Sequence, residues 1–104
     1  MSIQQHIESS PDLSSGRPRV AGTRVRVQDI VACHEFQGMT ADEIVDGYPH
    51  ITLADVYAAL AYYHDHRDEI RGHMKQDEDF VARFKAEYLI KQRGKDADAN
   101  TVSP

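Results

Sequence analysis

Residues 16–27 read GRPRVAGTRVRV and place four arginines among valines and a Gly-Thr pair. The alternation puts Val25 and Val27 on one side of an extended strand and the neighbouring arginines on the other. Gly22 supplies a backbone that tolerates positive φ, which a tight hairpin turn requires. We therefore predict a small β-hairpin with one apolar face and one cationic face.

The segment after the hairpin has the opposite charge. Residues 28–66 contain seven acidic residues and no lysine or arginine, a net charge of −7. Residues 1–27 carry +2 and residues 67–104 are balanced, so the chain as a whole carries −5. An acidic chain binds nucleic acid only through a local basic patch, and the hairpin is the one candidate for such a patch.

Length and composition are typical of one globular domain. The chain has 104 residues, of which 40% are hydrophobic and 28% charged. No window approaches about eighteen uninterrupted apolar residues, so we expect no membrane span. The start, MSIQQHIESS, lacks the pattern of a signal peptide. Cys33 is the single cysteine, which excludes an internal disulfide and predicts a cytoplasmic location, with Cys33 as a small core residue.

The segments on either side of the hairpin turn have recognisable local signals. We expect a short strand to begin over Ile3–Ile7, and Val20 and residues 25–27 to form the two arms of the hairpin. A first helix is predicted over about residues 28–37. Gly38 ends it, because glycine favours the position just past a helix C-terminus.

Two capping boxes predict the next two helices. Thr40 and Glu43 open one, and Thr52 and Asp55 open the other, because each pair satisfies two free amides at a helix start. The second of these helices is apolar nearly all round over Leu53–Tyr63. Such a helix is normally buried, within its own subunit or against a partner. We therefore expect a homodimer.

A longer helix is predicted over about residues 67–90. Its apolar stripe has helical spacing and consists of Ile70, Met74, Val81, Phe84 and Tyr88. We expect this stripe to bind a partner, as spaced anchors for the partner's groove. The alternative is a face that packs on the subunit's own core or on a dimer mate. Residues 93–104 have no apolar pattern and are expected to form a disordered tail.

These elements define a mainly α fold. We predict a short N-terminal β-hairpin (about 5–27), a trihelical helix-turn-helix-like, homeodomain-like unit (about 28–66) and the longer C-terminal helix, in one small domain over residues 1–92.

Two segments are candidates for nucleic-acid binding, and they differ in charge. The Thr52 helix occupies the place of a recognition helix but offers no arginine or lysine to phosphate or guanine. The better DNA-binding candidates are the hairpin arginines, Arg17, Arg19, Arg24 and Arg26. The alternative is that these arginines pair with the acidic segment, within one subunit or across a dimer.

Catalytic and metal chemistry find little support. There is no phosphate loop and no nucleophile elbow, and no Cys-x-x-Cys or His-Glu-x-x-His spacing occurs. His64 and His66 would point about 200° apart on a helix. We expect no enzyme activity, no metal and no cofactor.

Five short motifs carry a resemblance to a known family: GRP at 16–18, AGTRV at 21–25, MTADEI at 39–44, YPHIT at 48–52 and DVYAALAY at 55–62. As a set they resemble family 433 of the domains of unknown function, over about residues 5–66. The helix after Arg67 lies outside the resemblance.

The resemblance implies a small helical domain behind a hairpin, and a role as the antitoxin of a type II toxin–antitoxin pair. The expected partners are a PIN-type ribonuclease toxin and the chain's own promoter DNA. Because a nuclease cleft is cationic where RNA runs, an acidic protein can mask it as a competitor. The alternative function is a stand-alone DNA-binding regulator that uses the arginine-rich hairpin.

Overall fold

The computed structural model describes the backbone of residues 3–11 and 16–102, and the side chains of residues 5–11 and 16–93. The chain is mainly helical, with a two-stranded antiparallel sheet near its N-terminus and a long C-terminal helix, as predicted. It forms two compact units, the N-terminal unit (Met1–His73) and the C-terminal unit (Met74–Pro104). The sequence predicts one domain over residues 1–92, and the boundary between the units falls inside the last helix.

The sheet joins β1 (Ile7–Glu8) to β2 (Arg19–Val20). After β2 the chain folds back as predicted, and the amide of Val20 donates to the carbonyl of Val25 at 2.8 Å. The returning arm makes only one isolated bridge, between Arg19 and Arg26, and is not a strand. The returning arm is short because helix α2 begins directly after Arg26. The strand that pairs with β2 is therefore β1 and not this arm.

Residues 3–6 form a helical turn, α1 (Ile3–His6), where the sequence predicts the start of a strand. The His6 ring lies against helix α4 (Leu53–Asp65), with Nδ1 of His6 2.6 Å from Oδ1 of Asp55. This contact joins residues 49 positions apart. A local pattern cannot predict it, which explains why the strand prediction is wrong here.

The first predicted helix changes its winding midway. It starts as α2 (Val27–Val31) and continues as a π-helical segment, η2 (Ala32–Phe36). The amide of Gln37 donates to the carbonyl of Ala32, five residues earlier, at 3.1 Å. Gly38 follows with a φ of +69°, so the predicted helix end is confirmed.

Both predicted capping boxes are present. Thr40 opens α3 (Ala41–Gly47), where its hydroxyl oxygen accepts from the Glu43 amide at 3.2 Å. Thr52 opens α4 in the same way, and its hydroxyl oxygen accepts from the Asp55 amide at 3.1 Å. Each box satisfies two amides that a helix start leaves free, so these boundaries follow from local chemistry.

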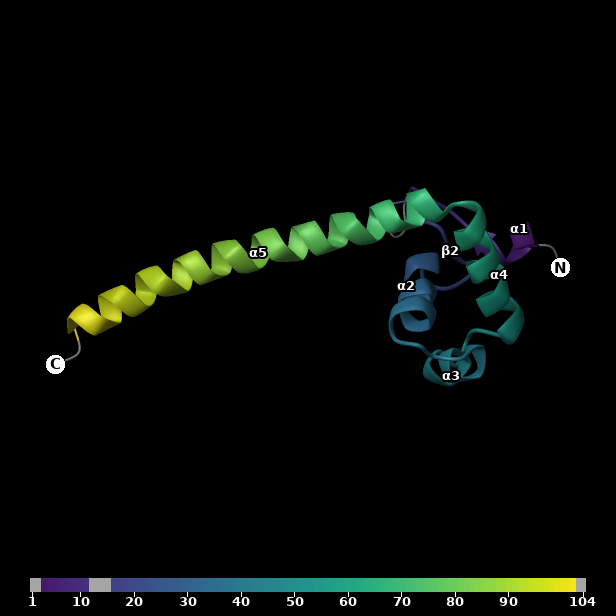
Figure 1. Ribbon diagram of the computed structural model, residues 1–104, viewed down its shortest axis with the longest axis horizontal. Helices are drawn as coiled ribbons and strands as arrows, with labels where there is room; N and C mark the ends of the chain where they lie inside the picture. The colour runs from purple at the N-terminus through teal and green to yellow at the C-terminus, as the bar shows by residue number, and fades with distance from the viewer. Residues whose placement is uncertain (1–2, 12–15, 103–104) are drawn as a thin grey trace. The chain divides into compact units, whose positions relative to one another are not determined.

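Helix α4 is central to the N-terminal unit, where it contacts α1, α2 and α3 (Figure 1). The described hydrophobic core comes from both strands, from α2, α3 and α4, and from the residues just before and after α4: Ile7, Val20, Val27, Ile30, Val31, Ile44, Ile51, Val56, Ala58, Ala59, Tyr63 and Ile70. Burial of α4 is incomplete, however. Leu53 and Tyr57 keep 42% and 61% of their surface exposed, so the described residues of this unit leave one face of the helix uncovered.

The last helix, α5 (Arg67–Val102), runs well past its predicted end at Ile90. Residues 93–102, predicted as a disordered tail, are its last turns, and residues 103–104 lie outside the described part. The lack of an apolar stripe indicates that these residues do not pack on a core, but it does not indicate that they are not helical. Extending an existing helix needs no new nucleus, and residues 91–102 contain no proline.

Candidate functional site

The turn between the hairpin arms is a rigid polar structure. Gly22 has a φ of +75°, and its amide donates to the Glu8 carboxylate at 3.1 Å. The Thr23 hydroxyl donates to the carbonyl of Val20 at 2.9 Å and accepts from the amide of Val25 at 3.1 Å. Glycine and threonine of the AGTRV motif therefore hold the turn itself, and they have structural roles.

Arg19 lies inside the protein and is only 5% exposed. Its Nη2 is 3.0 Å from Oε1 of Glu8, and the same oxygen accepts from the amide of Gly22. Within the described residues, its Nε and Nη1 have no hydrogen-bond partner. A guanidinium in this position cannot reach a phosphate without leaving the core.

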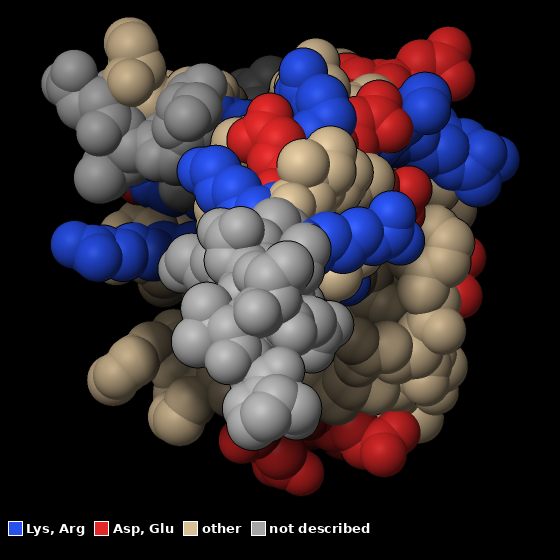
Figure 2. Space-filling model, turned by 90° about the vertical axis from the view of Figure 1, so that its left-hand side faces the viewer, with Lys and Arg blue, Asp and Glu red and all other residues tan. Residues whose placement is uncertain are grey.

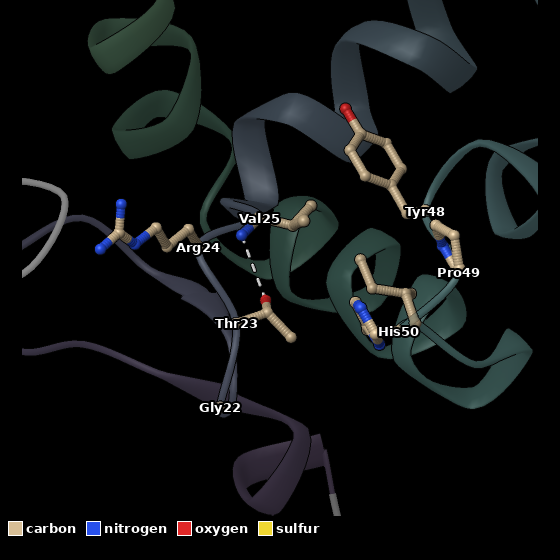
Figure 3. A pocket seen from close by; sticks show the side chains of 8 residues that line it. Gly22, Thr23, Arg24, Val25, Tyr48, Pro49 and His50 are labelled. Atoms are coloured by element: carbon tan, nitrogen blue, oxygen red, sulfur yellow. Dashed lines mark hydrogen bonds between the residues drawn. The ribbon is translucent and has the colours of Figure 1, made fainter.

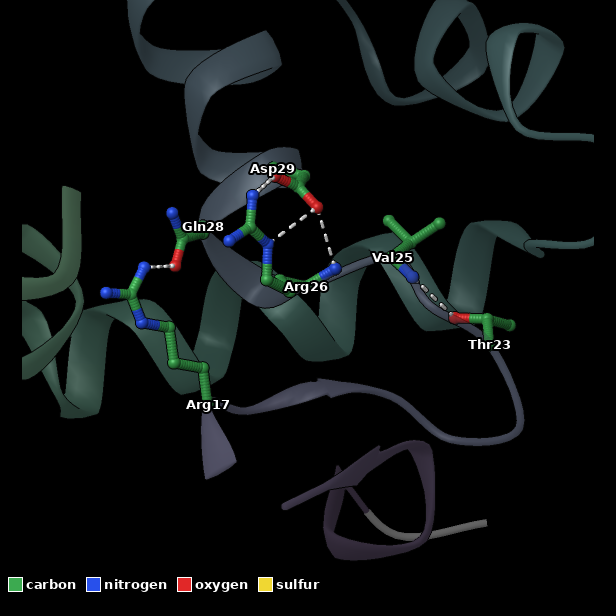
Figure 4. A network of polar contacts seen from close by, with 6 residues as sticks. All are labelled: Arg17, Thr23, Val25, Arg26, Gln28 and Asp29. Carbon is green, nitrogen blue, oxygen red and sulfur yellow. Dashed lines mark hydrogen bonds and ion pairs between the residues drawn. The ribbon is translucent and has the colours of Figure 1, made fainter. Parts of the chain in front are cut away.

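Arg26 and Arg17 hold side chains of helix α2 (Figure 4). Arg26 forms a fork with Asp29: its Nη2 is 3.0 Å from Oδ1 and its Nε 3.3 Å from Oδ2. Arg17 donates to the amide oxygen of Gln28 at 3.1 Å. Asp29 belongs to the acidic segment, residues 28–66. Its pairing with Arg26 is therefore the kind of contact that the alternative prediction describes, in which hairpin arginines pair with that segment.

Arg24 differs from the other three arginines. Its side chain is exposed and has no ion pair or hydrogen bond among the described residues. Figure 2 shows Lys and Arg side chains in blue and Asp and Glu side chains in red, and side chains of both signs are visible in this view. The sequence brings the four arginines into one segment, but the structure presents one of them to a ligand.

A hollow of about 240 Å³ separates this turn from the connection between α3 and α4. Its walls come from Gly22–Val25 and from Tyr48–Ile51, and Figure 3 shows the Arg24 side chain extending away from the Tyr48 side. Burial raises the pKa of the Tyr48 hydroxyl, with smaller contributions from Cys33 and Asp29. No single motif predicts this hollow. Its one signal in the sequence is the joint presence of the AGTRV and YPHIT motifs.

Carboxylates occupy the outer surface of the acidic segment. Glu35, Asp42, Glu43, Asp46 and Asp65 are all exposed. Glu43 accepts from the amide of Thr40, and this contact, together with the Thr40 hydroxyl, lowers the pKa of Glu43. The helix caps thus keep at least one of these groups ionised.

The predicted stripe on α5 divides between the two units. Ile70 is 1% exposed and belongs to the core of the N-terminal unit, so it is not available to a partner. Met74 is half-buried, whereas Val81, Phe84 and Tyr88 are exposed. The sequence could not separate these positions because they share one helical face.

The described residues contain no group of three or more His, Cys, Asp or Glu side chains placed to hold a metal ion. Cys33, expected in the core, is only half-buried, because η2 leaves its side chain near the surface. No helix in the described part of the chain is both long and apolar enough to cross a membrane.

Together these features define a small helical protein: a trihelical, helix-turn-helix-like unit behind a two-stranded sheet, followed by a long helix. Residues 7–63 match the family described as protein of unknown function (DUF433), and the chain belongs to this family. A crystal structure of a DUF433 member protein from Anabaena variabilis ATCC 29413 is similar, with a TM-score of 0.64 and 30% sequence identity. That match covers 70% of this chain and 71% of the other. No curated protein matches the chain.

Proposed function

We propose that this chain is a non-enzymatic, antitoxin-like protein that binds and neutralises a PIN-type ribonuclease. The resemblance of its motifs gives the class of partner. The observation that carries the proposal is the placement of charge in the N-terminal unit, where three of the four hairpin arginines are held by the protein's own groups and carboxylates lie outside.

Exposed carboxylates on α3 are the central part of this surface. Asp42 and Asp46 are exposed on one short helix, and no ion pair within the described residues joins either to a lysine or arginine. No lysine or arginine occurs anywhere in residues 28–66 to neutralise them. The segment therefore has an anionic field that is free to act on another molecule.

A ribonuclease has the complementary field. Its cleft must attract the phosphates of RNA, and a row of carboxylates can compete for the same cations. Complementary fields of this kind also speed association and reject partners of like charge. Toxin contact is thus assigned to the N-terminal unit, around Asp42, Glu43 and Asp46.

Promoter binding and a stand-alone DNA-binding role have weaker support. Of the four candidate arginines only Arg24 is exposed without a partner among the described residues, and phosphate binding usually needs several cations. Both roles depend on Arg24 and remain predictions.

The test is inhibition of a PIN-type ribonuclease from the same organism. RNA cleavage by the purified ribonuclease is measured with and without the chain, and we expect the chain to abolish it. The double variant Asp42→Asn/Asp46→Asn removes two exposed charges and should lose inhibition at least tenfold, about 1.4 kcal/mol of binding.

The matched control is Asp68→Asn/Asp79→Asn, which removes the same charge from α5. Asp68 lies in the first turn of α5, as Asp42 lies in the first turn of α3, so both double variants change one aspartate at a helix start. It should inhibit as well as the natural chain. Equal inhibition by the α3 variant would rule out the carboxylate surface, and no inhibition by the natural chain would rule out the function.

A further inference from the structure

The C-terminal unit exposes a dense apolar stripe. Phe80, Val81, Phe84 and Tyr88 keep 63%, 47%, 62% and 52% of their surface exposed. At about 100° per residue, the four side chains lie within about 100° of the helix circumference. Nothing else in this unit's described residues covers them, and large apolar faces of this kind mark binding surfaces.

The surface beside the stripe is grooved. Two hollows flank it, one on each side. Phe80, Arg83, Phe84 and Glu87 line the first, and Asp77, Glu78, Val81, Ala82 and Lys85 line the second. The first set has the spacing i, i+3, i+4, i+7, and so does the second apart from Asp77. This spacing is that of the grooves between neighbouring turns of a helix, so the grooves on both sides of the stripe are open.

The charge along the helix indicates which helix fits. Residues 77–79 are all acidic and carry −3, whereas residues 83–93 carry four basic residues and one acid, a net +3. Two parallel copies would place like charges together. In two antiparallel copies Glu78 of one copy lies near Lys85 of the other, which it does not in two parallel copies, so this pair of opposite charges favours the antiparallel orientation.

We propose that α5 pairs antiparallel with α5 of a second copy of this chain. Val81 of one copy packs against Phe84 of the other. In a heptad with Val81 and Phe84 at the two core positions, Glu78 and Lys85 occupy the same flanking position and face each other across the antiparallel pair. The pairing uses the C-terminal unit alone and is independent of the ribonuclease surface on α3.

Sedimentation equilibrium of the full chain tests the pairing. The natural chain should form a dimer, and Phe84→Asp should raise the dimer Kd at least about 30-fold, as loss of a central anchor does. Circular dichroism confirms that the variant is folded. A natural chain that is monomeric at high micromolar concentration, or a Phe84→Asp variant that still dimerises, would overturn the proposal.

Charge exchange tests the orientation. Glu78→Lys and Lys85→Glu should each raise the dimer Kd about tenfold, and the double variant should recover to within about threefold. The matched control is Asp79→Lys, which makes the same charge change on the opposite side of the helix and should leave the Kd within about twofold.

Failure of the double variant to recover would refute the antiparallel pair. So would a chain that is monomeric alone and associates through the stripe only when the ribonuclease is added.

Discussion

At the scale of single residues, Asp55 has two partners that fix the start of α4. Its carboxylate accepts from the amide of Thr52 at 2.9 Å and lies 2.6 Å from Nδ1 of His6. Burial by itself would raise the pKa of Asp55. The Thr52 amide and His6 together outweigh it and lower the pKa below its ordinary value of 3.8.

This shift predicts acid sensitivity. A carboxyl with a lower pKa in the folded protein adds stability above its ordinary pKa, and that stability is lost as the pH falls through the folded value. Asp55→Asn should therefore be less stable than the natural chain near neutral pH, and the difference should shrink below about pH 5. Urea unfolding at a series of pH values measures it.

Glu43→Gln is the control for that series. Glu43 has the same capping position on α3 but is exposed and has no histidine partner, so its effect should be smaller. A difference between Asp55→Asn and the natural chain that stays constant down to pH 2.5 would contradict the linkage.

Gly22 gives a prediction about backbone strain. Its φ is +75°, and a Cβ added there would meet nothing within 4 Å. The cost of Gly22→Val therefore comes from the backbone alone and should be about 1–3 kcal/mol. Gly22→Asn should cost less, because asparagine tolerates positive φ. Thermal unfolding compares the two, and unchanged stability with loss of partner binding would show that Gly22 contacts a ligand.

Arg19 and Arg24 should separate stability from DNA binding. Arg19→Ala loses a buried charged hydrogen bond and should cost about 1.5–3 kcal/mol. Arg24→Ala should stay within about 0.5 kcal/mol of the natural chain. If the chain binds DNA, fluorescence anisotropy should show weaker binding by folded Arg24→Ala at every salt concentration. Unchanged binding would exclude the hairpin as the contact.

At the scale of elements, what the sequence could predict depended on distance along the chain. The capping boxes of α3 and α4, and the turn at Gly22, are set within a few residues and were predicted correctly. The helical turn α1 depends on a contact 49 residues away, and no local pattern carries that information.

The candidate surfaces were predictable only in part. Alternation correctly indicated an apolar Val27 and an exposed Arg24, but it could not show that Arg19 turns inward to Glu8. On α5 the spacing identified one face. Where that face stops being core depends on how much of the helix the N-terminal unit covers, which only tertiary packing decides.

Truncation tests where the core ends. A chain ending at His66 loses Ile70, and removing such a side chain costs about 2–5 kcal/mol. A chain ending at His73 keeps the whole core and should fold. Urea unfolding of the two, with full-length Ile70→Ala as the control, measures the difference. Equal stability of the two shortened chains would show that Ile70 contributes nothing.

At the scale of the whole molecule, the acidic surface predicts a salt-dependent complex. Charges attract over about 10 Å at 0.1 M salt and about 3 Å at 1 M. The association rate with the ribonuclease should therefore fall as salt rises, while dissociation changes less. Stopped-flow mixing measures both rates. Asp42→Asn/Asp46→Asn should have the flatter salt dependence, and an association rate independent of salt would contradict the charge argument.

The contact between His6 and Asp55 also sets an order of events during synthesis. A ribosome adds about 5–20 residues per second, so His6 waits roughly 2–10 s before a partner 49 residues later has been made. Ile70, the last core residue of the N-terminal unit, follows later still. The nascent chain thus holds the His6 ring without Asp55 while α2 and α3 are made, and Ile70 can join the core only after α4 has been made.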